Sequence, residues 1–311
     1  MVKGNRRVGK KQVERKGENS MALKIITDSA SDVPKWLIDK YDLHVIPTPV
    51  VIEEQDYFDG KTIFPNEFYQ VLKSGKDIKT YHINSYMFKE NFLPYAKNKD
   101  EVIYVCFSTG IAGTFNAANL AKTEILEEYP DFDLTIIDSK SASLGFGLAV
   151  EKALRMQELG ASKEDIIKGI EFHCEHMEQI VTVETLEYLY KGGRLSRTSA
   201  IAGGLLDIKP IIEVNDAGSL TPIEKVRGRQ KSLKRLVEIV GERGADLENQ
   251  TIGLVHGDDP NTLSTVKEML KEKYGCKNFM ESYVGCAIGA HTGPGVIAII
   301  FLNEKSPFIE S

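Results

Sequence analysis

Short apolar runs alternate with amphipathic segments through the first half of the chain, and this alternation constrains the fold more than any other feature. The runs read ALKIIT at 22–27, LHVIPTPVVI at 43–52, EVIYVCF at 101–107 and DLTIID at 133–138. Between them, apolar residues recur at three- and four-residue spacing, which predicts helices over 65–74, 85–97, 114–129 and 145–159. Strands that alternate with helices favour an α/β domain with a mostly parallel, Rossmann-like sheet.

In the second half, strand-like runs no longer alternate regularly with helical segments, which predicts an α+β domain. Two strand-like runs, 208–214 and 219–226, flank the turn Asn215-Asp216-Ala217-Gly218. Asn, Asp and Gly tolerate positive φ, so this pair is predicted to form a β-hairpin. The other predicted elements are helices over 162–179, 228–244 and 260–273, and strands over 251–257, 277–285 and 295–302, the last two joined by a glycine-rich loop. The run QIVTVET follows the first of these helices and is not assigned to an element.

A helix end and a helix start meet near residue 160. Leu159-Gly160-Ala161-Ser162 reads as the end of one helix and the cap of the next, so the predicted domains span 21–160 and 161–311. Residues 1–20 carry seven Lys or Arg with no apolar run behind them. We expect a basic tail outside the fold, either disordered or foreign to the protein.

Composition removes several classes of function. The 311 residues carry a formal net charge of -6, which disfavours binding to nucleic acid, and no run approaches the roughly 18 apolar residues of a membrane span. The four cysteines form no C-x-x-C and no Cys/His pair at metal-ligand spacing. We therefore expect a cytoplasmic protein with reduced thiols, no metal and no integral membrane association.

The segment Ser108-Thr109-Gly110-Ile111-Ala112-Gly113-Thr114 follows a predicted strand and precedes a predicted helix. Strand ends on the carboxyl side are where open α/β sheets bind ligands. Two hydroxyls, two glycines and a helix N-terminus suit an anion, although a plain helix cap uses the same residues. The segment is not a Walker loop, and Gly145-Phe146-Gly147 lacks the third glycine of a dinucleotide fingerprint, so no cofactor is predicted.

Two further segments combine glycines with a cation. GCAIGAHTGPG at 285–295 holds His291 and Thr292 among four glycines and a proline, where backbone can approach a ligand closely. YKGGRLS at 190–196 predicts a turn that projects the Arg194 guanidinium, a group suited to carboxylate or phosphate. Lys225, Arg227, Arg229 and Lys231 follow later and are equally typical of a solvated helix start.

Taken in order along the chain, these motifs resemble the DegV family of bacterial lipid-binding proteins over about residues 22–303. The matching motifs are TDSASD at 27–32, STGIAGT at 108–114, DSKSASLGFG at 138–147, LEYLYKGGRLS at 186–196, IKPII at 208–212, the K-x-R-G-R run at 225–229, HGD at 256–258 and GAHTGPG at 289–295.

The resemblance implies a two-domain DegV-like fold with a long-chain fatty acid between the domains. Mapped by motif, its carboxylate ligands are Thr80, Ser108, Thr109 and His291. The family includes the binding subunits of fatty acid kinase, so the resemblance implies a carrier that presents the acid to a partner kinase for acyl-phosphate formation, without catalysis of its own. Arginines that match Arg194 and Arg227 are implied to serve phosphotransfer or docking of the kinase.

This chain departs from the family pattern near the head group. It has Thr80-Tyr81-His82-Ile83-Asn84 where the family usually shows Thr-Ser-Gln-Pro-Ser, and Ala112 where a Ser is usual. Tyr81 and His82 are therefore candidate pocket residues, together with Gly110, Gly113, Thr114 and Thr292.

Two other functions remain open from the residues alone. A serine hydrolase acting on a lipid or ester would use Ser108 as nucleophile, His291 as base and Asp28 or Asp258 as orienter, although no G-x-S-x-G elbow surrounds Ser108. A phosphate-ligand or nucleotide-binding module would use the helix start at 108–114.

Overall fold

A parallel sheet of four strands forms the first layer of the computed structural model, which describes residues 22–196 and 207–308. Its order is β2 (His44–Ile46), β1 (Leu23–Asp28), β6 (Glu101–Cys106) and β7 (Leu134–Asp138). The predicted parallel α/β sheet is confirmed. The predicted basic tail over 1–20 lies outside the described residues.

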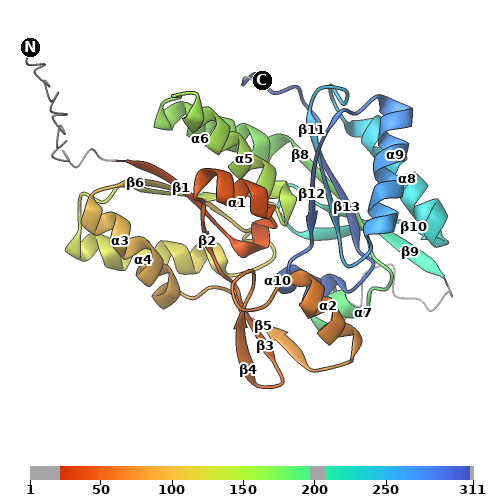
Figure 1. Cartoon of the computed structure of the whole chain (residues 1–311), viewed down its shortest axis with the longest axis horizontal. Helices are drawn as coiled ribbons and strands as arrows, with labels where there is room; N and C mark the ends of the chain where they lie inside the picture. Colours follow the sequence, from red (N-terminus) through yellow and green to blue (C-terminus); the bar gives the residue numbers. More distant parts are fainter. Residues whose placement is uncertain (1–21, 197–206, 309–311) are drawn as a thin grey trace, which may run out of the picture.

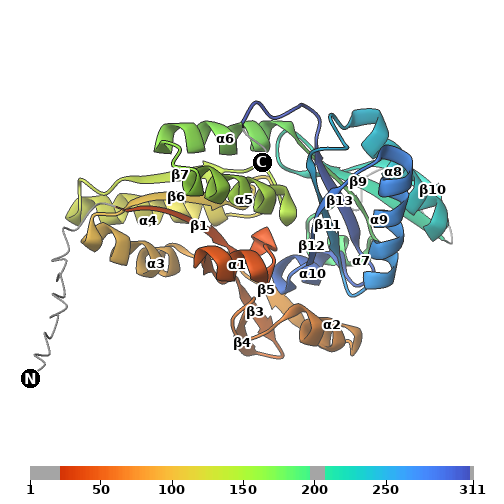
Figure 2. The same ribbon diagram turned by 45° about the horizontal axis from the view of Figure 1, so that its top comes forward.

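Alternate residues of these strands face opposite helix layers, as the period of two in a strand requires. Ile25 and Ile103 face α1 (Lys35–Tyr41), α5 (Leu144–Glu158) and α6 (Lys163–His176). Ile26 and Tyr104 face α3 (Ser85–Asn98) and α4 (Thr114–Glu128). Figures 1 and 2 show α3 and α4 on one side of the sheet and α5 and α6 on the other.

A small antiparallel sheet is inserted after β2, and the sequence did not predict it. It consists of β4 (Gln55–Phe58), β3 (Pro49–Ile52) and β5 (Ile78–Thr80), with α2 (Pro65–Lys73) between β4 and β5. The prediction of one strand over 43–52 was wrong, because β2 and β3 lie in different sheets. Pro47 and Pro49 lack the N–H that a continuous ladder needs, and the chain leaves the first sheet between them.

The second layer is a mixed sheet of six strands. In order these are β10 (Leu220–Arg227), β9 (Ile208–Val214), β8 (Met177–Thr182), β13 (Ile297–Leu302), β11 (Thr251–His256) and β12 (Asn278–Tyr283). The predicted hairpin is confirmed, since β9 and β10 pair antiparallel with Leu220 opposite Val214. Helices α8 (Arg229–Arg243) and α9 (Pro260–Tyr274) cover the outer face.

Two predictions for the second half need correction. The helix predicted over 162–179 ends at His176, and β8 begins at Met177. The glycine-rich segment between the last strands is not all loop, because Cys286–Thr292 form the short helix α10. A further helix, α7 (Glu187–Lys191), and the 3-10 turn Ser29–Ser31 were not predicted.

The inner face of the second sheet packs against α5, which joins the two layers. Leu144 and Leu148 of α5 share a core cluster with Val255 and Ile300 of the second sheet. The other side of α5 packs on the first sheet, and Ile166 and Ile170 of α6 join the same core cluster. The predicted domain boundary near 160 falls in the turn between these two helices and stays a prediction.

Candidate functional site

A cavity lies between the two layers, at the carboxyl ends of β1 and β6 and over the inner face of the second sheet. The volume open to the centre of a water molecule is about 110 Å³. That is several times the roughly 10–15 Å³ that one enclosed water needs in this measure. The cavity is therefore large enough for a ligand.

Hydrocarbon dominates the wall of this cavity. Eighteen of its 29 described lining residues are hydrophobic: Ala30, Phe107, Ile111, Ala112, Ala142, Val181, Val183, Leu189, Ile212, Val214, Leu220, Val255, Val284, Ala287, Ile288, Val296, Ala298 and Ile300. They come from both layers, so the cavity exists only because the two layers meet. An apolar ligand fits such a wall, since an apolar surface gains free energy by leaving water.

One end of the cavity carries a pair of polar side chains, one from the small sheet and one from α10. Nε2 of His291, in α10, lies 2.6 Å from Oγ1 of Thr80, the last residue of β5. Burial, and secondarily the nearby Arg194 guanidinium, lowers the pKa of His291 to about 4. The imidazole is therefore neutral at pH 7, and the pair can bind a ligand through hydrogen bonds rather than through a histidine charge.

The loop after α7 closes over this pair. A Cβ at Gly192 would overlap Nδ1 of His291, so only glycine permits this approach. Nδ1 is buried and has no hydrogen-bond partner among the described residues. Arg194 lines the cavity, and its Nη1 donates to the Gly192 carbonyl at 2.6 Å. The predicted turn that projects a guanidinium is thus brought to the His291 end.

Three other polar residues of the wall direct hydrogen-bonding atoms into the protein. Asp28 accepts from Tyr104 Oη at 2.7 Å and from Ala30 N at 3.0 Å, and burial raises its pKa to about 6. Gln179 accepts from Ala142 N at 3.1 Å, and Ser143 donates to Asp32. These residues leave the body of the cavity apolar.

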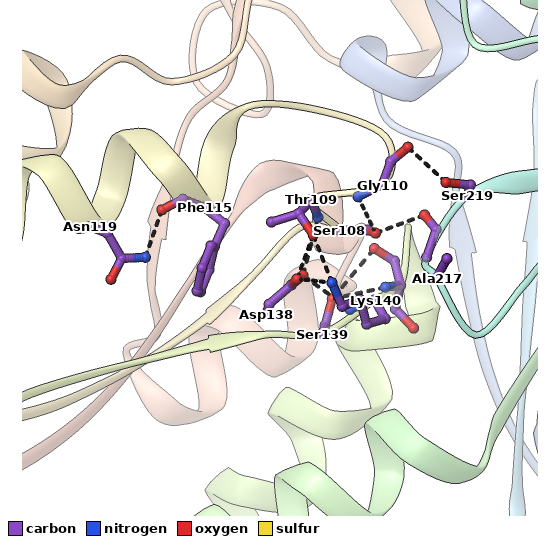
Figure 3. Close-up of polar contacts among 12 residues, drawn as sticks. Ser108, Thr109, Gly110, Phe115, Asn119, Asp138, Ser139, Lys140, Ala217 and Ser219 are labelled. Atoms are coloured by element: carbon purple, nitrogen blue, oxygen red, sulfur yellow. Dashed lines mark hydrogen bonds and ion pairs between the residues drawn. The ribbon is translucent and has the colours of Figure 1, made fainter.

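Ser108 and Thr109 do not line this cavity, although they lie beside it. The Ser108 hydroxyl is fully buried and donates to the Gly218 carbonyl at 2.7 Å, in the turn of the β9–β10 hairpin (Figure 3). Thr109 donates from N and Oγ1 to Asp138 at 3.1 and 2.6 Å. Burial opposes the ionisation of Asp138, but bonds from Lys140 and Thr109 outweigh it and lower the pKa of that carboxyl.

The hairpin turn fits tightly on the 108–112 loop. A Cβ at Gly110 would lie 2.5 Å from the Gly218 carbonyl oxygen, and a Cβ at Gly218 would overlap the Ser108 hydroxyl. Ser219 Oγ also donates to the Gly110 carbonyl at 3.2 Å (Figure 3). The predicted glycine of this loop therefore serves close approach of the hairpin, which closes one wall of the cavity.

The remaining predicted residues fall in three places. Tyr81, His82, Thr114 and Thr292 line the cavity. Gly113 precedes α4 and packs near the His82 ring, 3.6 Å from the position of a Cβ. Arg227 is exposed at the end of β10 and does not line the cavity.

The structure does not assemble the hydrolase alternative. The Ser108 hydroxyl is bonded to Gly218, whereas the His291 ring is bonded to Thr80, so nucleophile and base are not paired. Asp28 is bonded to Tyr104, and Asp258 forms an ion pair with Lys73. For the phosphate alternative, two donors of the 108–114 segment are already used, because Thr109 N and Gly110 N donate to Asp138 and to Ser108 Oγ, each at 3.1 Å.

Sequence reasoning missed the strand that supplies much of the wall. Gln179, Val181 and Val183 line the cavity at a spacing of two, along and just after β8. That alternation is present in QIVTVET and marks one face of a strand, but which face meets a cavity is set by the packing of α5.

A second space between the layers has the opposite character. It measures about 540 Å³ and lies along the later turns of α5, against the beginnings of β11 and β12. Charged and polar side chains line much of it: Glu151, Lys152, Arg155, His173, Asn249, Thr251, Lys277 and Asn278. We call this space the polar cleft.

The described residues contain no group of three or more His, Cys, Asp or Glu arranged to hold a metal ion. Over 22–196 and 207–308, every helix is too short or too polar to cross a bilayer. The four cysteines are all described and unpaired.

Sequence comparison identifies relatives along nearly the whole described chain. A family model described as "Uncharacterised protein, DegV family" matches residues 22–304. A DegV domain-containing protein of Clostridium perfringens is 38% identical over 286 residues, covering 91% of this chain and 98% of the relative. Another, from Caldanaerobacter subterraneus, is 36% identical over 281 residues, covering 90% and 98%.

Solved structures with the same fold include proteins described as binding fatty acids. A DegV family protein from Thermus thermophilus, described for its fatty acid binding, has a TM-score of 0.81 at 25% identity and covers 90% of this chain and 99% of its own. A stearic acid-binding protein from Eubacterium ventriosum has a TM-score of 0.80 at 27% identity, covering 90% and 98%. A fatty acid binding DegV from Bacillus subtilis has a TM-score of 0.79 at 29% identity, covering 90% and 99%.

Proposed function

The chain belongs to the DegV family, and on that premise we propose that its inter-domain cavity holds a long-chain fatty acid with the carboxylate at the Thr80 and His291 end. One observation carries the proposal: a wall made mostly of hydrocarbon includes the hydrogen-bonded pair Thr80 and His291, with the Arg194 guanidinium nearby. The fatty acids bound by similar solved proteins support it.

The hydrocarbon wall supplies most of the binding free energy in this proposal. Each buried methylene contributes about 0.8 kcal/mol, so a chain of roughly sixteen carbons contributes on the order of 10 kcal/mol before the costs of association. Such a ligand leaves slowly. Its carboxylate must then react or be recognised while it is still bound.

The tautomer of His291 decides what Thr80 can offer. Nδ1 is buried without a partner, and a buried unpaired N–H costs more than a buried unpaired acceptor. The proton therefore belongs on Nε2, which donates to Thr80 Oγ1. That leaves the Thr80 hydroxyl proton for the carboxylate, so His291 orients the donor and Thr80 makes the contact.

Charge at this end comes from Arg194 rather than from the histidine. Arg194 lines the cavity, and one of its guanidinium nitrogens is held by the Gly192 carbonyl. The cation attracts a carboxylate without a bidentate clamp that would occupy both oxygens. Carboxylate binding by Ser108 and Thr109 stays a prediction, and it requires the hairpin turn to release the Ser108 hydroxyl first.

We further propose that the protein is a carrier that presents this carboxylate to a fatty acid kinase. Tyr81, beside Thr80, is 54% exposed, so the polar end of the cavity borders the surface. Arg227 is exposed on the adjacent layer and is the proposed docking residue, with Arg194 nearer the carboxylate. The acyl phosphate would form on the bound acid, with the kinase supplying the catalytic groups.

Calorimetric titration with palmitate and with its methyl ester tests the binding site. Thr80→Val should weaken palmitate binding about tenfold or more, since a hydrogen bond to a charged group contributes about 1.5–3 kcal/mol. It should weaken ester binding less, because a hydrogen bond to a neutral carbonyl contributes only about 0.5–1.5 kcal/mol. Thr123→Val, on the exposed face of α4, is the matched control. If Thr80→Val binds palmitate as tightly as the unaltered protein, the carboxylate does not bind at Thr80, and the proposed site is wrong.

Phosphorylation by a bacterial fatty acid kinase with ATP, with the acyl phosphate trapped by hydroxylamine, tests presentation. Arg227→Ala should slow product formation while palmitate affinity stays constant, because Arg227 lies outside the cavity. Lys234→Ala, an exposed cation of α8, is the control. Equal rates in all three proteins would contradict the docking role of Arg227.

A further inference from the structure

The N-terminus of α10, the helix that carries His291, is capped by two aspartates from the first half of the chain, Asp32 and Asp59. Gly285 N, just before α10, donates to Asp32 Oδ1 at 2.9 Å. Cys286 N and Ala287 N donate to the two oxygens of Asp59, at 3.1 and 3.0 Å. These are N–H groups that a helix start leaves without intrahelical partners, and no side chain of α10 itself caps them.

Asp59 is built into this position. It follows β4 directly, is 3% exposed, and its own N–H donates to the Thr48 carbonyl at 2.9 Å. Burial raises the pKa of Asp59, while the N–H donors of α10 lower it. A Cβ at Gly285 would lie 2.6 Å from Asp32 Oδ1 and 3.0 Å from Asp59 Oδ2, so only glycine lets the helix start reach both carboxylates.

The small sheet therefore holds α10 at both ends. Asp59, after β4, bonds the first turn, and Thr80, at the end of β5, bonds His291 in the last turn. The Cα atoms of Cys286 and His291 are separated by five residues, or about 8 Å along a helix axis. Gly289 lies between them against Tyr69 and Phe68 of α2, where a Cβ would lie 2.7 and 3.0 Å from those side chains.

We propose that Asp59 is a positioning residue for the head-group end of the cavity, which sets the place of the His291 ring by fixing the first turn of α10 across the layer interface. This inference rests on the proposed function, in which His291 orients the Thr80 hydroxyl. Asp59 touches no ligand in this account. It acts only through the helix.

Imidazole resonances of His291 in the ligand-free protein give the first test, with the assignment made by their loss in His291→Ala. Asp59→Asn replaces one acceptor by an amide that faces a backbone N–H, so the His291 resonances should shift. Asp259→Asn is the matched control, because Asp259 caps α9 on the outer face by accepting from Thr262 N at 3.1 Å. Unchanged His291 resonances in a folded Asp59→Asn protein would overturn the inference.

A double-mutant cycle for palmitate affinity gives the second test. Asp59→Asn should weaken binding about tenfold in the unaltered protein and less than about twofold in His291→Ala, because residues that act through one another are not additive. An equal loss in both backgrounds would overturn positioning through His291. If the unaltered protein does not bind palmitate, the proposed function fails, and the resonance test still decides the role of Asp59. Should Asp59→Asn not fold, Asp32→Asn alters the Gly285 contact and also the bond that Asp32 accepts from Ser143. Both tests apply to it with the same expected signs, and Ser143→Ala is the control for the second contact.

Discussion

Among the described residues, the cavity and the polar cleft differ in chemistry although both lie against α5 and the second sheet. The cavity near the start of α5 is walled by hydrocarbon and measures about 110 Å³. The polar cleft along the later turns of the same helix measures about 540 Å³. We propose the smaller space as the lipid site, because pockets that bind apolar ligands are lined mostly by hydrophobic side chains.

The difference lies in residue type and charge, because the polar atoms of both walls bond to neighbouring groups of the protein. Asp28 and Gln179 line the cavity, but their side-chain oxygens accept hydrogen bonds from neighbouring groups of the protein. In the polar cleft, Glu151 pairs with Arg155, and Lys152 Nζ donates to the Phe308 carbonyl at 3.0 Å, so charge surrounds the space itself. Substitutions that fill or open one space but not the other therefore test the comparison.

Filling each space should have unequal consequences for lipid binding. Ala298→Phe places a ring in the cavity from β13 and should abolish palmitate binding, a loss of about a hundredfold or more, since several methylenes lose their place. Thr251→Phe fills the polar cleft from the neighbouring strand β11 and should leave affinity unchanged. Titration calorimetry on both folded variants measures this. Equal losses would mean that the comparison is wrong.

An alanine at Gly218, in the hairpin turn, should destabilise the protein and its cavity more than an alanine at Gly160. Gly218 (φ 74°) faces the Ser108 hydroxyl, whereas Gly160 (φ 80°) has nothing within 4 Å of a Cβ. Both Gly→Ala changes carry the strain of a positive φ, about 1 kcal/mol, but Gly218→Ala adds a clash and should lower the free energy of unfolding by about 1–3 kcal/mol more. It should also speed palmitate release. Urea unfolding and stopped-flow transfer to vesicles measure the two effects, and identical behaviour of the two variants would contradict the tight closure.

Protonation should distinguish the histidines of the two spaces. Burial lowers the pKa of His291, at the cavity, and of His173, at the polar cleft, to about 4. As pH falls from about 6.5 to 4, both histidines are protonated in the unfolded chain but stay neutral in the folded protein. Each histidine therefore lowers the free energy of unfolding, by on the order of 2 kcal/mol near pH 4. Bound palmitate should raise the pKa of His291 only, because a carboxylate beside an imidazole favours its protonated form. NMR titrations with and without palmitate check this, and a rise at His173 of equal size would contradict it.

Local patterns predicted most of the layers but not the tertiary contacts that define the site. The strands of the first sheet and the β9–β10 hairpin follow from apolar runs and from the Asn215 to Gly218 turn. The small sheet was missed because QDYF of β4 is polar and half exposed, with no apolar run to mark it. Tertiary packing, not local pattern, placed it.

The candidate site shows the same limit. The motif order pointed to Thr80, His291 and Arg194, and the structure brings all three to one end of the cavity. The Ser108 hydroxyl instead donates to the carbonyl of Gly218, 110 residues away, and no local sequence pattern predicts such a contact. The capping of α10 by Asp59 joins residues even farther apart, since Asp59 and Cys286 are 227 residues apart.

Organic extraction of the purified protein, followed by mass spectrometry, tests the central claim most directly. The account predicts a long-chain monocarboxylic acid at about one per chain in the unaltered protein and none in Ala298→Phe. Protein that carries no such acid and gains none from added palmitate would contradict it, as would an acid retained in full by the filled cavity.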